Sequence, residues 1–355
     1  MTFPNTAASS SQPEISVVIL NYNGAKWLTR CLESLRGQTI FSQIEIILAD
    51  NLSTDGSDKL SEELVKDMPN ALFVQNGANF GFCEGNNRGA RFATGKYLFF
   101  LNNDTWLEPD CLEVLLKETE QARAAASTPL VMNFDDNSFQ SMGAFGFDFF
   151  GFPTSRLQDT RTREVLMPEG CSYLIKRELF DQLGRFDSEL FMFADEYDLS
   201  FRVWISGHNA IAVPAARLHH RGAANVNPKG GGTTVEFRTS DTKRFFANRN
   251  NLMVLLKNAK NILFLMALLQ IGLLLAEALV GLVLIRRWGF IKRSYLQAFT
   301  DCWRLRNHIL AERKRARTFR RRGDWYMLRF FRFRLNRWDE VKRLRQFGVP
   351  KVTAS

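Results

Sequence analysis

The chain has 355 residues, of which 45% are hydrophobic and 24% are charged. This composition supports a buried core and excludes a disordered protein, a collagen-like repeat and a small disulfide scaffold. The net charge of +10 is unevenly distributed, because residues 286–355 contain 21 Lys and Arg against 5 Asp and Glu, while residues 1–285 have a net charge of −6. We therefore expect a mildly acidic domain joined to a strongly basic tail, and not a generic basic DNA-binding domain.

The five cysteines are far apart in the sequence and form no C-x-x-C pair. An odd, dispersed set argues against a disulfide framework and a zinc site, and it favours a reducing compartment. Residues 1–13 are rich in Ser, Thr, Gln and Pro, and they lack the basic and apolar regions of a signal peptide. We expect them to form a disordered leader, and we expect the folded domain to face the cytosol.

Residues 15–101 alternate short apolar runs with amphipathic stretches. The runs of strand length are residues 15–20, 44–49, 71–75 and 97–101. Apolar residues recur at helical spacing between the first two runs, and further helices are predicted at 57–66 and 84–93. This β-α-β-α order predicts an α/β fold with a Rossmann-like, mostly parallel sheet flanked by helices, and ligands bound at the carboxyl ends of the strands.

The second half of the domain has a less regular order of elements. We expect helices at 109–122, 177–183 and 195–206, a strand at 171–175, a Phe- and Gly-rich loop at 144–152 and a flexible loop at 228–234.

Residues 262–285 form a nearly continuous apolar run, interrupted by Gln270 and Glu277. A run of this length can span a membrane. Basic residues flank both ends, however, and a carboxylate at mid-run costs about 2.5–3.5 kcal/mol on insertion scales. Ala267, Gln270, Glu277 and Gly281 share one helical face, which favours a monotopic or re-entrant helix. A single span and a buried core helix are the alternatives.

Two polar motifs follow the first two predicted strands. Asn21-Tyr22-Asn23-Gly24 can direct backbone N–H groups at an anion, although a capped β-α turn is the commoner role of such a tetrapeptide alone. In Asp50-Asn51-Leu52-Ser53-Thr54-Asp55-Gly56-Ser57, the first carboxylate can accept a hydrogen bond from N3–H of a uracil or thymine ring, while Ser53 and Asp55 close the turn. An N-capping loop explains the second motif equally well.

A third constellation begins at Asn79-Phe80-Gly81-Phe82 and continues with Gly85, Asn86 and Gly89. Three glycines within nine residues imply a close approach of backbone. Asn102-Asn103-Asp104 then follows the fourth strand, where a carboxylate suits a hard divalent cation that bridges two phosphates. An ordinary turn is the alternative for this last segment.

In this order and spacing, the three motifs resemble the nucleotide-sugar half of the family 2 glycosyltransferases, whose fold is of the GT-A type. The resemblance covers residues 15–257 and is greatest to the rhamnosyltransferase-like branch. It implies a nucleotide-sugar half at 14–107 and an acceptor half at 108–258, followed by a helical, membrane-associating region at 259–355.

On the donor side, the resemblance makes Asp50 the base-binding carboxylate and aligns Asn102–Asp104 with the family's Asp-x-Asp metal motif. Because the first Asp is Asn here, Asp104 and the donor diphosphate would hold the divalent cation, Mg²⁺ or Mn²⁺. The residues expected at the donor are Asn21, Asn23, Asp50, Ser53, Asp55, Asn79, Gly81, Asn86, Asn102, Asn103, Asp104 and Arg249.

On the acceptor side, the residues implied by the resemblance are Gly170, Cys171, Asp195 and Asp198. The family's Glu-Asp-x-Asp-Leu motif corresponds to Asp195-Glu196-Tyr197-Asp198-Leu199, so the expected catalytic base is Glu196. A carboxylate there can take the proton of the acceptor hydroxyl as its oxygen attacks C1 of the sugar. Acids at a helix N-terminus can instead stabilise the helix dipole, and we expect Asp198 to have the structural role of pairing with Arg202 at i,i+4.

The family also has a metal-ligating His after a later strand, and His219 is the preferred match. His220 is the second choice, because a one-residue shift in alignment exchanges the two. Arg249-Asn250 resembles a family Arg-Asn pair near the diphosphate or the acceptor, and Gly230–Gly232 lies where a lid could close over the donor.

The tail interleaves aromatic residues with arginines, as in residues 325–334. Basic amphipathic helices with Trp and Phe suit an anionic membrane surface, although the same composition can bind single-stranded nucleic acid by stacking. Because the apolar run is adjacent, we favour contact with a membrane through residues 262–345 and expect no nucleic acid.

The sequence thus predicts an inverting glycosyltransferase at the cytoplasmic face of the cell (inner) membrane, held there as a peripheral, monotopic or single-span protein. It would move a sugar, rhamnose by resemblance, from a UDP- or dTDP-linked donor to a hydroxyl of a saccharide or lipid-linked glycan in cell-surface polysaccharide synthesis.

A non-catalytic nucleotide-binding scaffold with the same fold is the main alternative. A processive synthase is disfavoured because the sequence has neither several apolar spans nor a Gln-x-x-Arg-Trp motif. A nucleotidyltransferase is disfavoured because no Gly-rich phosphate loop follows the first strand.

Overall fold

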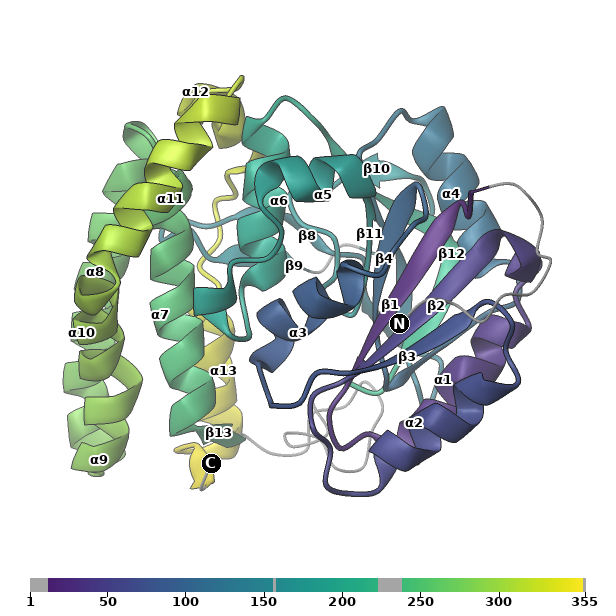
Figure 1. Cartoon of the computed structure of the whole chain (residues 1–355). Helices are drawn as coiled ribbons and strands as arrows, with labels where there is room; N and C mark the ends of the chain where they lie inside the picture. The colour runs from purple at the N-terminus through teal and green to yellow at the C-terminus, as the bar shows by residue number, and fades with distance from the viewer. Residues whose placement is uncertain (1–11, 156–157, 223–237, 354–355) are drawn as a thin grey trace.

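The computed structural model describes residues 12–155, 158–222 and 238–353 (Figure 1). Most of the expected leader, residues 1–11, lies outside the described residues, as does the predicted loop 228–234 with its Gly230–Gly232 lid.

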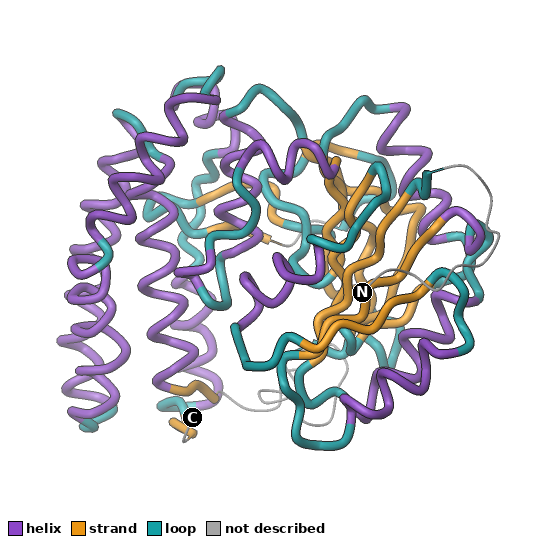
Figure 2. Tube along the Cα trace, viewed as in Figure 1, coloured by secondary structure: helices purple, strands orange, loops and turns teal. Residues whose placement is uncertain are grey.

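A ten-stranded mixed sheet forms the centre of the domain (Figure 2). Its parallel part consists of β1 (Ile15–Asn21), β2 (Ile44–Asp50), β3 (Ala71–Gln75) and β4 (Tyr97–Asn102). β1 lies between β2 and β4, and β3 pairs with the outer side of β2. The predicted parallel sheet is confirmed, and its strands are apolar on both faces because helices cover both.

The second half of the sheet is mixed. β11 pairs antiparallel with β4 and connects it to β6, which in turn pairs with the long strand β12. The bounds are β5 (Thr105–Leu107), β6 (Ala126–Asn133), β7 (Phe139–Ser141), β10 (Arg163–Glu164), β11 (Ser172–Lys176) and β12 (Ala210–His220). This arrangement places the ends of β12 and β4 at the same edge of the sheet.

Two hydrophobic cores lie on the two faces of the sheet. Alternate residues of β1 point to opposite faces, so that Val17 and Ile19 join one core and Val18 joins the other. The first core is covered by α1 (Ala25–Arg36), α2 (Ser57–Lys66) and α4 (Cys111–Gln121). The second is covered by α3 (Gly81–Ala90), α5 (Arg177–Leu183), α6 (Asp195–Ile205) and α7 (Asp241–Asn258).

The C-terminal helices form a layer beside the sheet, with α7 between that layer and α6 (Figure 1). The layer consists of α8 (Ile262–Leu284), α9 (Trp288–Ile291), a π-helical turn (Lys292–Leu296), α10 (Gln297–Arg304), α11 (Arg306–Phe319), α12 (Asp324–Met327) and α13 (Arg337–Phe347). A short parallel pair, β13 (Arg238–Ser240) and β14 (Lys351–Thr353), joins its two ends. Of the described helices, α8 is long and apolar enough to cross a membrane, by length and composition alone.

Two predicted elements differ from the structure. The segment predicted as a loop at 144–152 contains strand β8 (Ala144–Phe147), which pairs with β9 (Pro153–Ser155). The basic tail stabilises this hairpin, because the backbone N–H of Arg332 donates to the carbonyl of Phe147 at 2.8 Å. This contact is remote in sequence, so no local pattern could reveal it.

The helix predicted at 84–93 begins earlier, at Gly81. The side-chain oxygen of Asn79 accepts a hydrogen bond from the Gly81 N–H at 3.0 Å and forms an Asx turn at the start of the helix. Gly81 itself has a φ of +73°, and a Cβ there would lie within 2.5 Å of the Phe191 ring. The glycine is therefore required both by the backbone conformation and by the close approach of the segment before α6.

Candidate functional site

The carboxyl ends of β1, β2 and β4 bring the first set of predicted residues together. In the parallel register Asn21 lies opposite Asp50, and Asn102 lies opposite Leu20. The Asn21 amide donates to Asp50 Oδ1 at 2.8 Å and accepts from the Asn103 amide at 2.8 Å. A continuous row of hydrogen-bonded side chains, Asp50, Asn21 and Asn103, thus runs along this edge as far as the residue before Asp104. We call it the polar row.

Asp50 is fully buried, and both of its carboxylate oxygens are engaged. Oδ1 accepts from Asn21 and from the Ser53 hydroxyl at 2.6 Å. Oδ2 accepts from the Ser53 backbone N–H at 2.9 Å and from the Gln75 amide at 3.1 Å. Because an ionised carboxylate has about four acceptor positions, this one is fully satisfied by protein groups. Gln75 was not predicted as a site residue, although its place at the end of β3 opposite Asp50 is a usable signal.

The turn after β2 is closed by short hydrogen bonds among the predicted residues. The Asn23 backbone N–H donates to the Ser53 hydroxyl at 2.9 Å, and its side chain accepts from the Thr54 N–H at 2.8 Å. Asp55 accepts from the Ala25 N–H at 3.1 Å and from the Ser57 hydroxyl at 2.6 Å. These contacts fix the two loops to each other, as the capping interpretation of both motifs requires.

The predicted residues of α3 adjoin the same edge. Asn51, which was not predicted, donates to the carbonyl of Gly81 at 3.0 Å and to Asn79 at 3.4 Å. Asn86 is buried and donates to the carbonyl of Phe82 within its own helix at 2.9 Å. Asn79 and Gly81 therefore border the Asp50 loop, whereas Asn86 has a structural partner.

The histidine next to Asp104 is His220, the second choice of the sequence analysis after His219. His220 Nε2 lies 3.3 Å from Asp104 Oδ1 and 3.5 Å from the Asn102 amide. Its other ring nitrogen lies 2.9 Å from Gln140 Oε1. Burial alone would raise the pKa of Asp104, but the hydrogen bond and charge of His220 hold that pKa below its ordinary value.

His219 points to the opposite face of β12, because successive residues of a strand alternate. Its ring stacks on Trp106 with centroids 3.6 Å apart, and Nε2 lies 3.4 Å from Glu108. The two adjacent histidines are equivalent in sequence, and only strand pairing separates them.

Asp104 and His220 offer one oxygen and one nitrogen ligand to a divalent cation. No group of three or more His, Cys, Asp and Glu side chains that could hold a metal ion occurs within residues 12–155, 158–222 and 238–353. Two adjacent protein ligands fit an ion that completes its coordination with water and diphosphate oxygens, as Mg²⁺ and Mn²⁺ commonly do.

Glu196 lies in the first turn of α6, against Gly170. A Cβ at Gly170 would lie 3.3 Å from the Glu196 carboxyl carbon, so this glycine leaves room for the acid. Burial and the neighbouring Asp195 hold the pKa of Glu196 well above its ordinary value, and Glu169 adds to this effect. Burial, followed by the charge of Asp198, raises the pKa of Asp195 to about 6.

Asp195 and Glu196 are adjacent acids whose pKa values are both raised. Because two buried carboxyl groups this close do not both ionise without cost, the pair favours holding a proton. Glu169, the third acid of this cluster, is held by the Gly143 N–H at 3.0 Å and by the Ser141 hydroxyl. Cys171 is buried one residue beyond Gly170, and its carbonyl accepts from the Asn102 N–H at 3.0 Å.

Asp198 has the predicted structural role. It accepts from Arg202 Nη2 at 2.7 Å, lies 3.0 Å from Lys257 Nζ and accepts from Asn258 at 2.7 Å, with no exposed surface. Lys257 also bonds Asp187, the N-cap of the turn before α6. These buried, fully paired charges join α6 to α7.

Arg249 and Asn250, predicted near the diphosphate or the acceptor, hold the backbone of the segment before α6. Arg249 Nη2 donates to the carbonyl of Glu189 at 2.6 Å. The Asn250 amide donates to the carbonyls of Leu190, Met192 and Phe193 at 2.7–2.8 Å.

Three non-glycine residues of this segment, Phe191, Phe193 and Ala194, have positive φ angles of 63°, 68° and 59°. Each such conformation costs on the order of 1–3 kcal/mol. The two α7 side chains therefore stabilise a strained segment that sets the start of α6 and the position of Glu196.

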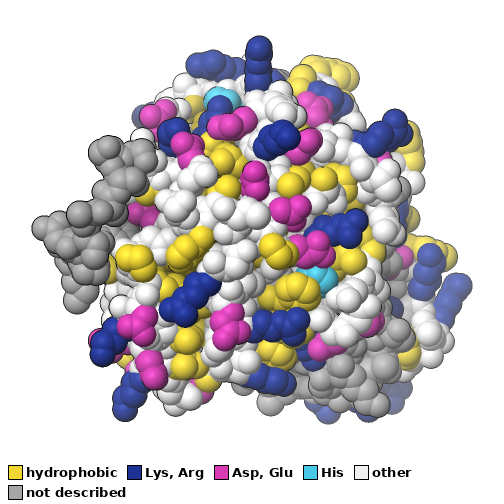
Figure 3. Space-filling view, turned by 90° about the vertical axis from the view of Figure 1, so that its right-hand side faces the viewer, with side chains coloured by type: hydrophobic (Ala, Val, Ile, Leu, Met, Phe, Trp, Pro, Cys, Tyr) yellow, Lys and Arg dark blue, Asp and Glu magenta, His cyan; other side chains and the backbone are white. Residues whose placement is uncertain are grey.

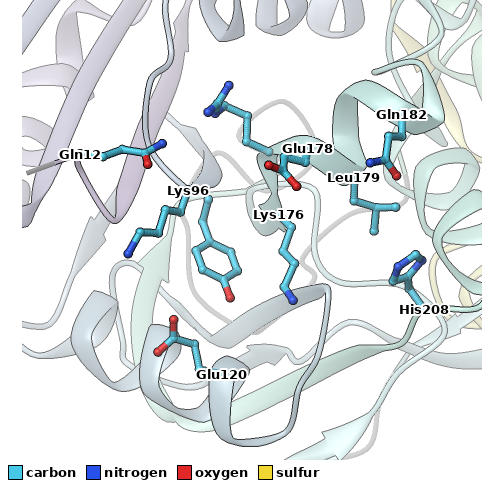
Figure 4. A pocket seen from close by; sticks show the side chains of 10 residues that line it. Gln12, Lys96, Glu120, Lys176, Glu178, Leu179, Gln182 and His208 are labelled. Carbon is cyan, nitrogen blue, oxygen red and sulfur yellow. The ribbon is translucent and has the colours of Figure 1, made fainter.

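A cavity of about 380 Å³ lies at the opposite end of β4 (Figure 4). Lys96, Lys176, Glu120, Glu178 and His208 line it. Because Lys96 precedes β4 and Asn102 ends it, this cavity is separate from the polar row and contains none of the predicted site residues.

Comparison with known proteins agrees with this geometry. Residues 16–184 match the model of glycosyl transferase family 2. These residues are similar to a family 2 glycosyltransferase domain. The chain is 29% identical over 235 residues to human polypeptide N-acetylgalactosaminyltransferase 16, covering 61% of this chain and 42% of that protein. The chain thus spans less than half the length of this relative.

A second relative is the N-acetylglucosaminyl-diphospho-decaprenol L-rhamnosyltransferase of Mycobacterium tuberculosis (strain CDC 1551 / Oshkosh), 27% identical over 238 residues and covering 58% of this chain and 76% of that protein. The crystal structure of GalNAc-T7 with UDP, GalNAc and Mn²⁺ aligns with 72% of this chain and 49% of its own, with a TM-score of 0.57 and 19% identity. This similarity confirms the GT-A fold of the glycosyltransferase domain.

The raised pKa values at the start of α6 predict a pH-dependent stability of the glycosyltransferase domain. A carboxyl whose folded pKa lies above its unfolded pKa binds more protons in the folded state, so stability falls as pH rises through that window. The wild type should therefore lose stability relative to Glu196→Gln as the pH rises. The loss should begin near pH 4, the pKa of an unfolded carboxyl group, and continue past pH 6, the approximate pKa of Asp195 in the folded protein.

We expect the stability of the Glu196→Gln variant relative to the wild type to increase from pH 4.5 to pH 8. Chemical denaturation at both pH values measures the free energy of unfolding of the two proteins. A difference between the two proteins that does not change with pH would contradict the raised pKa of Glu196.

The Asn250 amide donates to three carbonyls of the segment before α6. We therefore expect Asn250→Ala to lower the free energy of unfolding by about 2–4 kcal/mol, because the three carbonyls lose this partner. It should also expose residues 189–194 to limited proteolysis. Asn251→Ala is the matched control, since Asn251 donates only to the carbonyl of Ala247 within α7. If the two substitutions lowered the free energy of unfolding equally, Asn250 would not have this stabilising role.

Proposed function

We propose that this chain transfers a sugar from a nucleoside diphosphate sugar to an acceptor hydroxyl with inversion at C1. The observation that carries the proposal is the polar row at the carboxyl ends of β1, β2 and β4, which leads from Asp50 to the Asp104–His220 pair. In a parallel α/β sheet this edge is where ligands bind. The match of residues 16–184 to the model of glycosyl transferase family 2 supports the same reaction class.

The donor nucleobase would bind beside Asp50 and Gln75. Asp50 accepts four hydrogen bonds and has no free acceptor position while Gln75 donates to Oδ2. The bond from Gln75 is the longest of the four, at 3.1 Å. We propose that N3–H of uracil or thymine takes the place of the Gln75 amide on Oδ2. A UDP- or dTDP-linked donor satisfies this requirement, because both bases carry N3–H, and a cytosine base does not.

The diphosphate end of the donor would lie at Asp104 and His220, which would hold a divalent cation. When bound, the cation would neutralise the charge that develops on the departing diphosphate. Asn103 keeps the backbone before Asp104 tied to Asn21, so that the carboxylate has a fixed position relative to Asp50.

Glu196 would act as the catalytic base. The acceptor oxygen forms a bond to C1 as the bond from C1 to the diphosphate oxygen breaks, and the hydroxyl proton passes to the Glu196 carboxylate. Asp195 supports this role because its neighbouring charge raises the pKa of Glu196 and so favours uptake of the proton.

The acceptor is proposed to be a saccharide or lipid-linked glycan at the cytoplasmic face of a membrane, as in cell-surface polysaccharide synthesis. The apolar helix α8 and the basic tail support membrane association. The similarity to the mycobacterial L-rhamnosyltransferase, which covers 76% of that protein, supports rhamnose as the sugar.

Glu196→Gln tests the proposed reaction. It removes the base while keeping the shape of the side chain, so transfer should fall by about 10²–10⁴-fold. Donor binding, measured by calorimetry with UDP- and dTDP-sugars, should stay within a few fold. The matched control is Glu63→Gln on the exposed side of α2. Transfer at the wild-type rate would reject the role of Glu196, and donor binding without turnover in the wild type would favour the scaffold alternative.

The metal proposal predicts different outcomes at the two adjacent histidines. His220→Ala should weaken the Mn²⁺-dependent binding of a nucleoside diphosphate by on the order of 10–100-fold, because one of two protein ligands is lost. His219→Ala should leave this binding unchanged and lower the melting temperature through loss of the Trp106 stack. Calorimetry with and without Mn²⁺ measures the first effect, and the reverse pattern would restore His219 as the ligand.

A further inference from the structure

The outer face of α8 is apolar and uncovered. Leu265, Leu268, Leu275, Leu279 and Val283 share one helical face, at intervals of three, seven, four and four residues, and are 46% to 68% exposed. An apolar strip of this length on a helix is unusual in water, because exposed apolar patches promote aggregation unless a partner covers them.

The inner face of α8 is packed and carries its polar groups. Ala267, Gln270 and Leu274 are fully buried. The side chain of Ile291 packs closely against Gly281, because a Cβ placed on this glycine would lie only 2.8 Å from Ile291 Cδ1. Glu277 pairs with Arg337 of α13 at 2.9 Å. The predicted small and polar face is therefore the side held by the protein, and the leucine face is the side turned away.

The chain before α8 and the chain after it lie on the same side. Arg244 of α7 makes two hydrogen bonds of 3.0 Å to the Glu340 carboxylate of α13. Strands β13 and β14, which precede and follow α8, pair over three residues. Asp324 also accepts hydrogen bonds from the backbone N–H groups of Asn261 and Leu263 at the start of α8. A single transmembrane span would place these partners on opposite sides of the membrane and break every one of these contacts.

The surroundings of α8 are basic. Arg287 and Lys292 follow its end and are exposed, and Arg293 is exposed as well but lies 3.7 Å from Asp241. Some tail arginines bind the glycosyltransferase domain through neutral backbone carbonyls, as in Arg313 to Leu256 at 2.8 Å and Arg322 to His208 at 2.6 Å, whereas Arg329 pairs with Glu164. The bonds to carbonyls hold the tail without cancelling its charge.

Aromatic side chains complete this surface. Trp288 follows α8 directly and is 57% exposed. Tryptophan favours the boundary between acyl chains and headgroups. By contrast, the side of the molecule viewed in Figure 3 shows Lys and Arg interspersed with Asp and Glu.

We propose that α8 lies in the plane of an anionic membrane leaflet, with its leucine face among the acyl chains and the basic residues around it on lipid phosphates. The glycosyltransferase domain and the whole tail then remain on one side of the membrane. An amphipathic helix in this position enters about 5–10 Å into the leaflet. This inference does not rest on the proposed transfer reaction, because binding to lipid requires no donor or acceptor.

Vesicle flotation tests the occupant of the leucine face. The full chain should float with vesicles that contain phosphatidylglycerol and much less with pure phosphatidylcholine. Leu279→Glu combined with Val283→Glu should reduce flotation by about tenfold or more, because two buried side chains lose their transfer free energy. The matched control is Lys59→Glu, an exposed position on α2 that gives the same change in net charge.

Circular dichroism and calorimetry with a nucleoside diphosphate check that the double variant is folded. Equal flotation of the double variant and the control would overturn the proposal. So would a wild-type dimer that the double variant converts to a monomer, because a second copy would then cover α8.

Cysteine labelling tests the in-plane orientation. All five native cysteines are buried, so Lys260→Cys and Arg287→Cys each add one accessible thiol, at either end of α8. With the protein in sealed vesicles whose cytosolic face is outward, an impermeant maleimide should label both positions equally, as it labels Lys59→Cys in the domain. Labelling of only one end would show a span and overturn the proposal.

Discussion

The parallel register of β1, β2 and β4 is the constraint on which the candidate site depends. It sets Asn21 opposite Asp50, and it allows one buried amide to bridge the base-side carboxylate and the loop that carries Asp104. A slip of one residue would turn these side chains to the other face of the sheet. Asn21 has no exposed surface and uses both ends of its amide, so a register error would leave buried polar groups without partners.

The start of α6 is costly to fold, and α7 offsets that cost. Three positive φ angles and two acids with raised pKa values lie within residues 191–196. Such features lower stability, and they persist only where surrounding contacts determine the conformation. Asn250 supplies three hydrogen bonds, and Lys257 pairs with Asp187 and Asp198. The position of the proposed base thus depends on a helix that begins more than forty residues later in the chain.

Helix α7 also connects the glycosyltransferase domain to the helical layer that carries the proposed membrane surface. α7 contacts α6 on one side and α8, α10 and α11 on the other. Because α8 is held to the same layer by Asp324 and Arg337, the leucine face has a fixed orientation relative to the polar row. A lipid-linked acceptor would therefore meet the domain in one orientation at the membrane surface, which reduces the entropy lost on binding.

The sequence by itself determined the local elements and the residue types at the strand ends. Apolar runs between amphipathic stretches predict the parallel strands, and polar residues after each run predict the edge that carries Asp50 and Asp104, because both signals are periodic and local. The spacing of Asp198 and Arg202 likewise predicts their ion pair.

Tertiary structure decided which of several similar side chains face one another. Strand pairing directs His220, and not His219, to Asp104, and the fold ties Arg249 to the backbone carbonyl of Glu189. The contact of β8 with Arg332 of the tail and the pairing of β13 with β14 were likewise set by residues far apart in the chain. These choices depend on burial and on long-range hydrogen bonds, which a linear pattern of residue types does not encode.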